Sequence, residues 1–263
     1  STVVFNAAAA TNIPGYNENI GYYHLSLVPT GTATYSFTAS DHYIDGNWVL
    51  GNGTNALTFN SATSTTYIRA SGNMTLNNNV TFTNPGTINF RGSSTSHTLT
   101  DNNATKQNLG NLNVHSFSGA TTLNLGSSIA AAKVEVESST TFSLNGANTL
   151  TLTGSGTGAA RPFRILTGAT FTPSTGTVAY TGTSATDIEN YYNDTVPDYY
   201  NLSIIPAATV TYNFSDATAV TMRIDNTLLI GNGTNAVTVT AATYNPAIDL
   251  RGGVTLAANA VYS

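Results

Sequence analysis

The sequence predicts an all-β chain that coils into a right-handed parallel β-helix, or β-solenoid. Three observations predict this fold. Apolar residues alternate with polar ones over short runs, turn-forming pairs such as Asn-Gly and Pro-Gly separate the runs about every ten residues, and similar segments recur along the chain. Connections between parallel strands are right-handed in nearly all known cases, which sets the expected hand.

The strands are expected to be short, about three to five residues each, with one face buried. Period-two alternation begins at Val3/Phe5 and continues through Leu57/Phe59 to Val237/Val239. One stretch, Ser127–Val136, has some helical character, but its end already alternates like a strand. At most one turn of helix is therefore expected.

Internal repetition suggests how these strands are organised. The hexapeptide GNGTNA occurs at 51–56 and again at 231–236, and a degenerate copy lies within Ser143–Leu152. Further segments recur in the same order: STVVF (Ser1–Phe5), GTINF (Gly86–Phe90) and GTVAY (Gly176–Tyr180), then HLSL (His24–Leu27), NLNV (Asn111–Val114) and NLSI (Asn201–Ile204). We expect one elongated domain, 1–263, of three units of about 88 residues, roughly 1–85, 86–175 and 176–263.

Tandem immunoglobulin-like β-sandwiches are the alternative fold, since seven or eight short strands would fit in each unit. The solenoid is favoured because alternation runs through both unit junctions without a linker-like stretch. Stacked coils about 4.8 Å apart would form a rod of roughly 50–60 Å.

The repeated hexapeptide is interpreted as a corner of the coil. Glycine reaches positive φ without strain and asparagine tolerates the left-handed region, so Asn-Gly suits a tight turn. The predicted turn residues are Asn52, Gly53, Asn145, Gly146, Asn232 and Gly233.

The segments GATFTPSTGTVAYTG (168–182) and YYNLSI (199–204) resemble repeats of large secreted or cell-surface prokaryotic proteins, adhesin-like chains with parallel β-helical folds. The similarity covers nearly the whole chain. It implies an extracellular scaffolding, adhesion or surface-layer role, and it supplies no catalytic residue.

Composition excludes several classes of function. Charged residues make up only 8% of the chain, the net charge is −5, and the eight basic residues are scattered, which argues against nucleic-acid binding. The absence of cysteine excludes disulfides and thiolate metal sites. No apolar run is long enough for a transmembrane helix. The balance of Thr, Asn, Ser and Gly suggests a secreted or cell-surface location.

Acidic residues offer two candidate sites. Asp187, Glu189, Asp194 and Asp198 form a cluster that could bind calcium through carboxylate oxygens, although a solvated loop is the simpler interpretation. Glu135 and Glu137 share a strand face at a spacing that glycoside hydrolysis could use. Because no aromatic subsite flanks them, we expect a solvated pair, no cofactor and no catalysis.

Arginine and tyrosine provide the remaining candidates. Arg69, Arg164 and Arg251 recur near the end of each unit, where they could donate to backbone carbonyls of the next coil or bind a ligand. Two tyrosine-rich loops could bind glycans or another surface protein, or pack against neighbouring rods. These loops contain Tyr16, Tyr22, Tyr23, Tyr191, Tyr192, Tyr199 and Tyr200.

Neither end of the sequence shows a capping segment of the kind that closes solitary repeat proteins. We therefore expect copies to stack head to tail as a structural stalk or filament outside the cell, or the sequence to be a window of a longer chain of such units. An adhesin that binds surfaces through its tyrosine loops is the alternative function.

Overall fold

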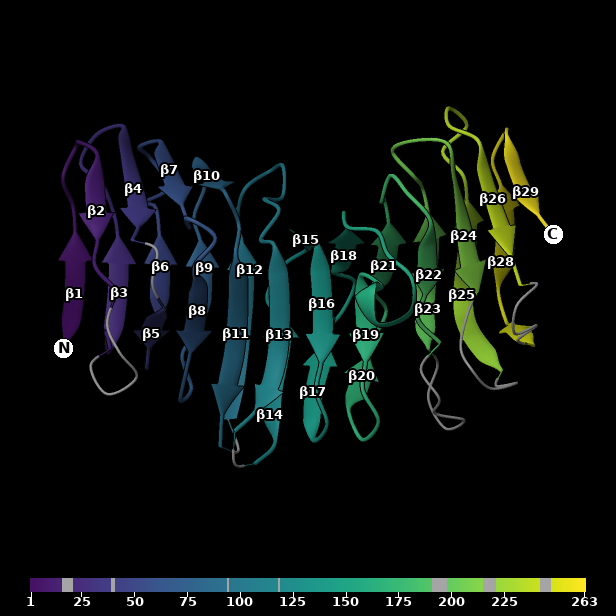
Figure 1. Ribbon diagram of the computed structural model, residues 1–263, viewed down its shortest axis with the longest axis horizontal. Coiled ribbons are helices and arrows are strands. Elements are labelled where there is room, and N and C mark those ends of the chain that lie inside the picture. Colours follow the sequence, from purple (N-terminus) through teal and green to yellow (C-terminus); the bar gives the residue numbers. More distant parts are fainter. Residues whose placement is uncertain are drawn as a thin grey trace.

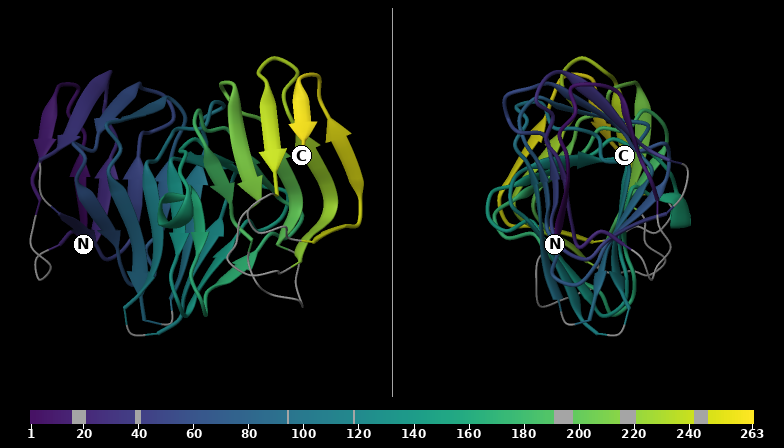
Figure 2. Two further views of the ribbon diagram at one scale, coloured as in Figure 1. Left: turned by 45° about the vertical axis from the view of Figure 1, so that its right-hand side comes forward. Right: turned by 90° about the vertical axis from the view of Figure 1, so that its left-hand side faces the viewer.

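The computed structural model describes residues 1–15, 21–38, 41–93, 95–117, 119–190, 198–214, 221–241 and 247–263. These residues form a parallel β-solenoid of about 10 turns, with short strands side by side along its length (Figure 1). Seen along that length, successive coils surround a common centre (Figure 2). The predicted all-β solenoid is therefore confirmed.

Two sheets, A and B, begin at the N-terminal end. Sheet A contains β1 (Thr2–Phe5), β3 (His24–Leu27), β6 (Trp48–Leu50), β9 (Met74–Leu76), β12 (Thr95–Asp101), β14 (Thr121–Leu125), β17 (Thr140–Ser143) and β20 (Thr170–Thr172). Sheet B is shorter and contains β2 (Thr11–Ile13), β4 (Ala33–Phe37), β7 (Leu57–Asn60) and β10 (Val80–Thr83).

Three further sheets form the rest of the solenoid. Sheet C contains β5 (His42–Ile44), β8 (Thr65–Ile68), β11 (Thr87–Gly92), β13 (Asn111–Ser116), β16 (Lys133–Val136) and β19 (Phe163–Ile165). Sheet D contains β15 (Ile129–Ala131), β18 (Thr149–Leu152), β21 (Thr177–Tyr180), β23 (Tyr199–Ile204), β25 (Met222–Ile230), β27 (Ile248–Leu250) and β28 (Gly253–Leu256). Sheet E contains β22 (Thr186–Ile188), β24 (Val210–Phe214), β26 (Val237–Thr240) and β29 (Ala260–Tyr262).

The pairing of these strands excludes the alternative fold. Every strand ladder within the described residues is parallel, whereas immunoglobulin-like sandwiches are built from antiparallel sheets. The stretch Ser127–Val136 forms β15 and β16 rather than a helix. The helical content of the described chain is one 3₁₀ turn, Gly158–Ala160.

Alternating burial explains why these sequences form strands. In β14 the side chains of Leu123 and Leu125 are fully buried, while Asn124 between them is half-buried on the outer face. The parallel register places like residues in adjacent coils, so Phe142 lies against Phe171 with ring centroids 5.9 Å apart. Such contacts join inward side chains from Ile13 to Val239 into one core along the solenoid.

The three units of about 88 residues are not confirmed. The corresponding segments STVVF, GTINF and GTVAY lie in β1, β11 and β21, which belong to sheets A, C and D. Coil length also varies, since Thr121 pairs with Thr140 but Thr141 pairs with Thr170. The unit that repeats in space is the single coil. The similarity between the 88-residue units reflects similar strand-and-turn patterns that lie in different sheets of the solenoid.

Candidate functional site

The asparagines of the two GNGTNA segments tie each corner to the neighbouring coil. Asn52 Oδ1 accepts hydrogen bonds from the N–H groups of Thr54 and Asn55 at 2.9 and 2.8 Å, and its Nδ2 donates to the Pro29 carbonyl at 2.7 Å. Asn232 makes the same three contacts, the last one to Pro206. Gly53 and Gly233, which follow these asparagines, have φ of 79° and 77°. These amides therefore stabilise the corners.

The degenerate middle copy turns differently. Asn145 itself adopts φ of 52°, Gly146 follows with φ of 97°, and Asn145 Nδ2 donates to the Leu125 carbonyl at 3.3 Å. Asn148 donates to the same carbonyl at 3.0 Å. The link to the preceding coil is thus kept although the sequence of the turn has changed.

The recurring arginines contact carboxylates, and the expected hydrogen bonds to backbone carbonyls of the next coil stay a prediction. The pairs are Arg69 with Asp45 (2.6 Å), Arg164 with Glu135 (3.3 Å) and Arg251 with Asp249 (3.0 Å). In the first two pairs the carboxylate belongs to the preceding coil of sheet C, because β8 pairs with β5 and β19 pairs with β16. These arginines therefore link coils through their side chains.

The tyrosines of the two loops have different environments. Tyr16, Tyr191 and Tyr192 lie outside the described residues. Tyr22 is buried and donates to the Pro14 carbonyl at 2.8 Å, Tyr199 is fully buried, and Tyr200 is half-buried. Tyr23 is 56% exposed and stands edge-on to His24, with ring centroids 4.6 Å apart. Among the described members, Tyr23 is the most exposed to solvent.

The described acidic residues of the calcium candidate each have a protein partner. Asp187 accepts hydrogen bonds from the Gly158 N–H and the Asn213 amide at 2.7 and 3.1 Å. Glu189 pairs with Arg161 at 2.9 Å, and Asp198 accepts the Arg223 N–H at 2.7 Å. Asp194 lies outside the described residues, within which no group of three His, Asp or Glu could hold a metal ion. Calcium binding here stays a prediction.

Glu135 and Glu137 each contact basic side chains on sheet C. Glu135 lies 2.7 Å from Lys133 Nζ and 3.3 Å from Arg164 Nη1, and Glu137 lies 2.5 Å from His115 Nδ1. Burial alone would raise the pKa of Glu135, but the hydrogen bonds and charges of Lys133 and Arg164 outweigh it and lower that pKa. An ionised carboxylate cannot act as the general acid of glycoside hydrolysis.

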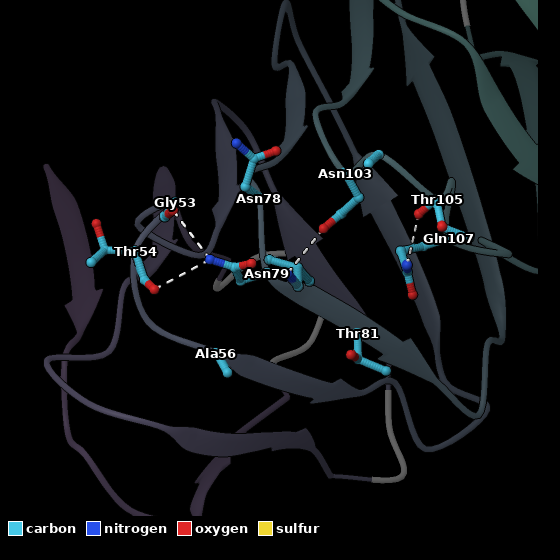
Figure 3. A pocket seen from close by; sticks show the side chains of 11 residues that line it. Gly53, Thr54, Ala56, Asn78, Asn79, Thr81, Asn103, Thr105 and Gln107 are labelled. Carbon is cyan, nitrogen blue, oxygen red and sulfur yellow. Dashed lines mark hydrogen bonds between the residues drawn. The ribbon is translucent and has the colours of Figure 1, made fainter.

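A hollow of about 660 Å³ lies where sheet B ends at β10 (Figure 3). Its lining consists of small, amide and hydroxyl side chains without a charged group, including Thr54, Asn78, Thr81 and Thr105. The Asn79 side chain crosses part of the hollow, and its Nδ2 donates to the Gly53 and Thr54 carbonyls at 3.3 and 3.2 Å.

Side chains replace the missing strand at this edge. Asn103 Oδ1 accepts the Val80 N–H and Gln107 Oε1 accepts the Phe82 N–H, both at 3.2 Å, as carbonyls of another strand would. The buried carboxylate of Asp101 holds this loop by accepting the N–H groups of Asn103 and Gln107 at 2.9 and 2.7 Å. This loop was not predicted from the sequence, although the buried carboxylate at an inward position of β12 marks it.

Replacing Asn103 with alanine is expected to destabilise the protein by about 1–3 kcal/mol, because the buried Val80 N–H loses its acceptor. Urea unfolding of wild type and variant measures the change. The control is Asn78→Ala in the same hollow, whose exposed side chain should change stability by less than about 0.5 kcal/mol. Equal losses in the two variants would contradict the role of Asn103.

The sparse positive charge of the chain gathers on sheet C. Four of the eight basic residues stand on its strands or directly after one of them: Arg69, Arg91, Lys133 and Arg164. Their positions alternate with buried residues such as Ile68, Phe90 and Val134, so the charged groups lie on the outer face. Half of the basic residues of the chain therefore lie on the outer face of sheet C, some of them paired with carboxylates.

No protein-family model matches the chain, and the comparisons with curated proteins and with solved structures found no match. The prokaryotic, adhesin-like origin stays an expectation. In the part of the chain that the structure describes, no helix is both long and apolar enough to cross a membrane. Function must therefore be inferred from the geometry of the solenoid itself.

Proposed function

We propose that the protein is a non-catalytic structural component of the cell exterior, whose solenoids assemble end to end into a stalk or filament. The observation that carries this proposal is the state of the two end coils. At both ends, inward-facing apolar side chains that should lie in a core are open to solvent.

The apolar side chains of the two end coils are exposed because no further coil packs on them. Val3, Val254, Leu256 and Tyr262 are between 40% and 54% exposed. Their pairing partners one coil further in are at most 5% exposed: Leu25, Leu228, Ile230 and Val239. Since the same inward positions are buried as soon as another coil covers them, a further coil is the natural partner of each end.

The C-terminal end is also hollowed. A cavity of about 290 Å³ is lined by apolar side chains from the last coils, among them Ile248, Leu250, Val254 and Leu256. The described strands β28 and β29 pair on one side only, with β25 and β26, and β1 pairs only with β3. Each end thus combines an open strand edge with uncovered apolar surface, which favours addition of strands.

The two ends fit each other in register. In β28 the inward residues are Val254 and Leu256, and in β1 they are Val3 and Phe5. Placing GVTL beside TVVF as parallel strands stacks Val254 on Val3 and Leu256 on Phe5. The outward residues Thr255 and Val4 then become neighbours. A second copy of this chain is therefore the partner we propose for each end.

Cysteines at Val4 and Thr255 should link separate copies into covalent chains. Neighbouring strands lie about 4.8 Å apart, within the Cα separation that a disulfide spans. Because the chain has no cysteine, a double variant Val4→Cys, Thr255→Cys carries no other thiol. Mild oxidation followed by denaturing, non-reducing electrophoresis should give a ladder of multimers that reductant removes.

The control variant joins Thr255→Cys with Asn12→Cys, an exposed outward position on β2 that the proposed register leaves apart from β28. It should give little beyond single symmetrical dimers. The proposal is wrong if the matched variant forms no ladder, or if both variants form equal ladders. Electron microscopy of the unmodified protein over a concentration series provides a second readout, filaments against separate rods.

The alternative function, surface binding through the tyrosine loops, keeps one observation in its favour. Tyr23 exposes more than half of its ring, as a residue that contacts a sugar or a protein would. If assembly fails, replacing Tyr23 with alanine in a glycan-binding screen is the direct test of that role.

A further inference from the structure

A second hollow, of about 370 Å³, lies on the outer face of sheet C in coils well inside both ends. Two arginines line it, Arg69 just after β8 and Arg91 in β11, together with the ring of Phe117. Because Ile68 pairs with Phe90, the two arginines occupy adjacent positions on neighbouring coils. Among the described residues no carboxylate lines this hollow, although the chain as a whole has a net charge of −5.

Aromatic rings hold both guanidinium groups in place. Tyr43 and Tyr67 stack with centroids 4.7 Å apart and an interplanar angle of 6°. Arg69 Cζ lies 5.0 Å from the Tyr43 centroid, and Arg91 Cζ lies 4.5 Å from the Tyr67 centroid. Asp45 Oδ1 accepts a hydrogen bond from Arg69 Nε at 2.6 Å. The two adjacent positive charges are thus pre-positioned by contacts that the ligand does not have to supply.

Phe117 adds an apolar surface beside these charges. Its side chain is 67% exposed, and Arg91 Cζ lies 5.2 Å from its ring centroid. The other large apolar side chains of the described chain that are exposed to a similar degree belong to the end coils, apart from Tyr23. Neither the core nor end-to-end stacking accounts for an exposed phenyl ring here, whereas an aromatic platform beside cations is a recognition surface.

We propose that this hollow binds an acidic sugar, a uronate unit of an anionic polysaccharide. The sugar carboxylate would accept hydrogen bonds from Arg91 and Arg69, which suit bidentate recognition. The apolar face of the sugar ring would lie on Phe117. An inorganic anion would use the arginines but leave the phenyl ring without a role, so the ring favours the sugar.

Calorimetric titration of the whole protein with an oligogalacturonate tests this proposal. We expect binding that weakens as salt is added, because exposed charges are screened. The methyl-esterified oligomer of the same length, which lacks the negative charge, should bind at least tenfold more weakly. Inorganic phosphate at the same concentration should not compete.

Two substitutions separate the roles of charge and ring. Arg91→Gln and Phe117→Ala should each weaken binding about tenfold or more, and Arg91→Lys should restore only part of it, because the planar stacked group is lost. The matched control is Arg164→Gln, which removes an arginine from the same face outside the hollow and should leave binding unchanged. Unfolding temperatures show whether each variant remains folded.

Three results would overturn the proposal: no binding of the oligogalacturonate, equal binding of its methyl ester, or equal losses in the Arg91 and Arg164 variants. Competition by phosphate would assign the arginines to a simple anion site. Because the hollow lies away from β1, β28 and β29, these outcomes do not depend on whether the solenoids stack.

Discussion

Replacing Arg161 with alanine is expected to destabilise the protein by about 3–5 kcal/mol, because the Glu189 carboxylate would stay buried without its counter-ion. Arg161 Nη1 lies 2.9 Å from Glu189 Oε2, and the glutamate side chain is only 4% exposed. Glu189 Oε1 also accepts the N–H of Ile165 at 3.2 Å, so the carboxylate joins two coils.

Two buried tyrosines complete this network. Tyr199 donates its hydroxyl to the Glu189 carbonyl at 2.6 Å, and the Tyr180 hydroxyl accepts the Glu189 N–H at 3.2 Å. The two hydroxyls lie 3.1 Å apart. Burial raises the pKa of both phenols, so both remain protonated at neutral pH. Glu189 is thus held by its backbone as well as its side chain and cannot easily turn towards solvent when Arg161 is lost.

Urea unfolding of Arg161→Ala measures the loss, and Arg164→Ala is its control. Arg164 is more exposed, and its partner Glu135 keeps Lys133 at 2.7 Å, so this variant should lose less than about 1 kcal/mol. A loss below about 1 kcal/mol for Arg161→Ala would show that Glu189 finds another partner or water.

The sequence predicted the fold because burial in a solenoid has the period of a strand. In LTFN (Leu57–Asn60), Leu57 and Phe59 are buried, while Thr58 and Asn60 lie outward. The same alternation recurs in nearly every coil, so even strands of three residues could be identified by pattern.

The side of the coil on which each strand lies could not be predicted. Alternation distinguishes inward from outward positions but is the same on every sheet. The number of residues in each corner decides which sheet the next strand joins. HLSL and NLNV look alike, yet they belong to sheet A and sheet C. The expected three-unit repeat followed from this local likeness.

The candidate sites were harder to predict because they join residues from different coils. Tyr43, Tyr67, Arg91 and Phe117 are far apart in sequence and become neighbours only through the register of sheet C. Conversely, Tyr199 belongs to a tyrosine-rich segment that suggested a binding loop, but its position on β23 faces the core. Only the strand register distinguishes residues that form a surface cluster from residues that lie in the core.

Trp48 is one of the largest fully buried side chains of the core. It is fully buried in β6 between two coils, where it pairs with Leu25 and Met74. Its ring lies 5.6 Å from Phe37 and 5.5 Å from Phe59, centroid to centroid. Within the described residues its Nε1 has no hydrogen-bond partner. This indole therefore contributes apolar volume while carrying an unsatisfied donor.

These two properties predict losses of stability of different size for two substitutions. Trp48→Ala should cost about 3–5 kcal/mol, since it leaves a cavity among rings fixed by neighbouring coils. Trp48→Phe should cost less than about 1.5 kcal/mol, because a smaller cavity is offset by removal of the unsatisfied N–H. Urea unfolding of the wild type and both variants measures the difference, and fluorescence quenching of the single tryptophan in the wild type checks its burial. Equal, large losses would mean that the Nε1–H has a partner such as a buried water, and that its contribution to the core is polar as well as apolar.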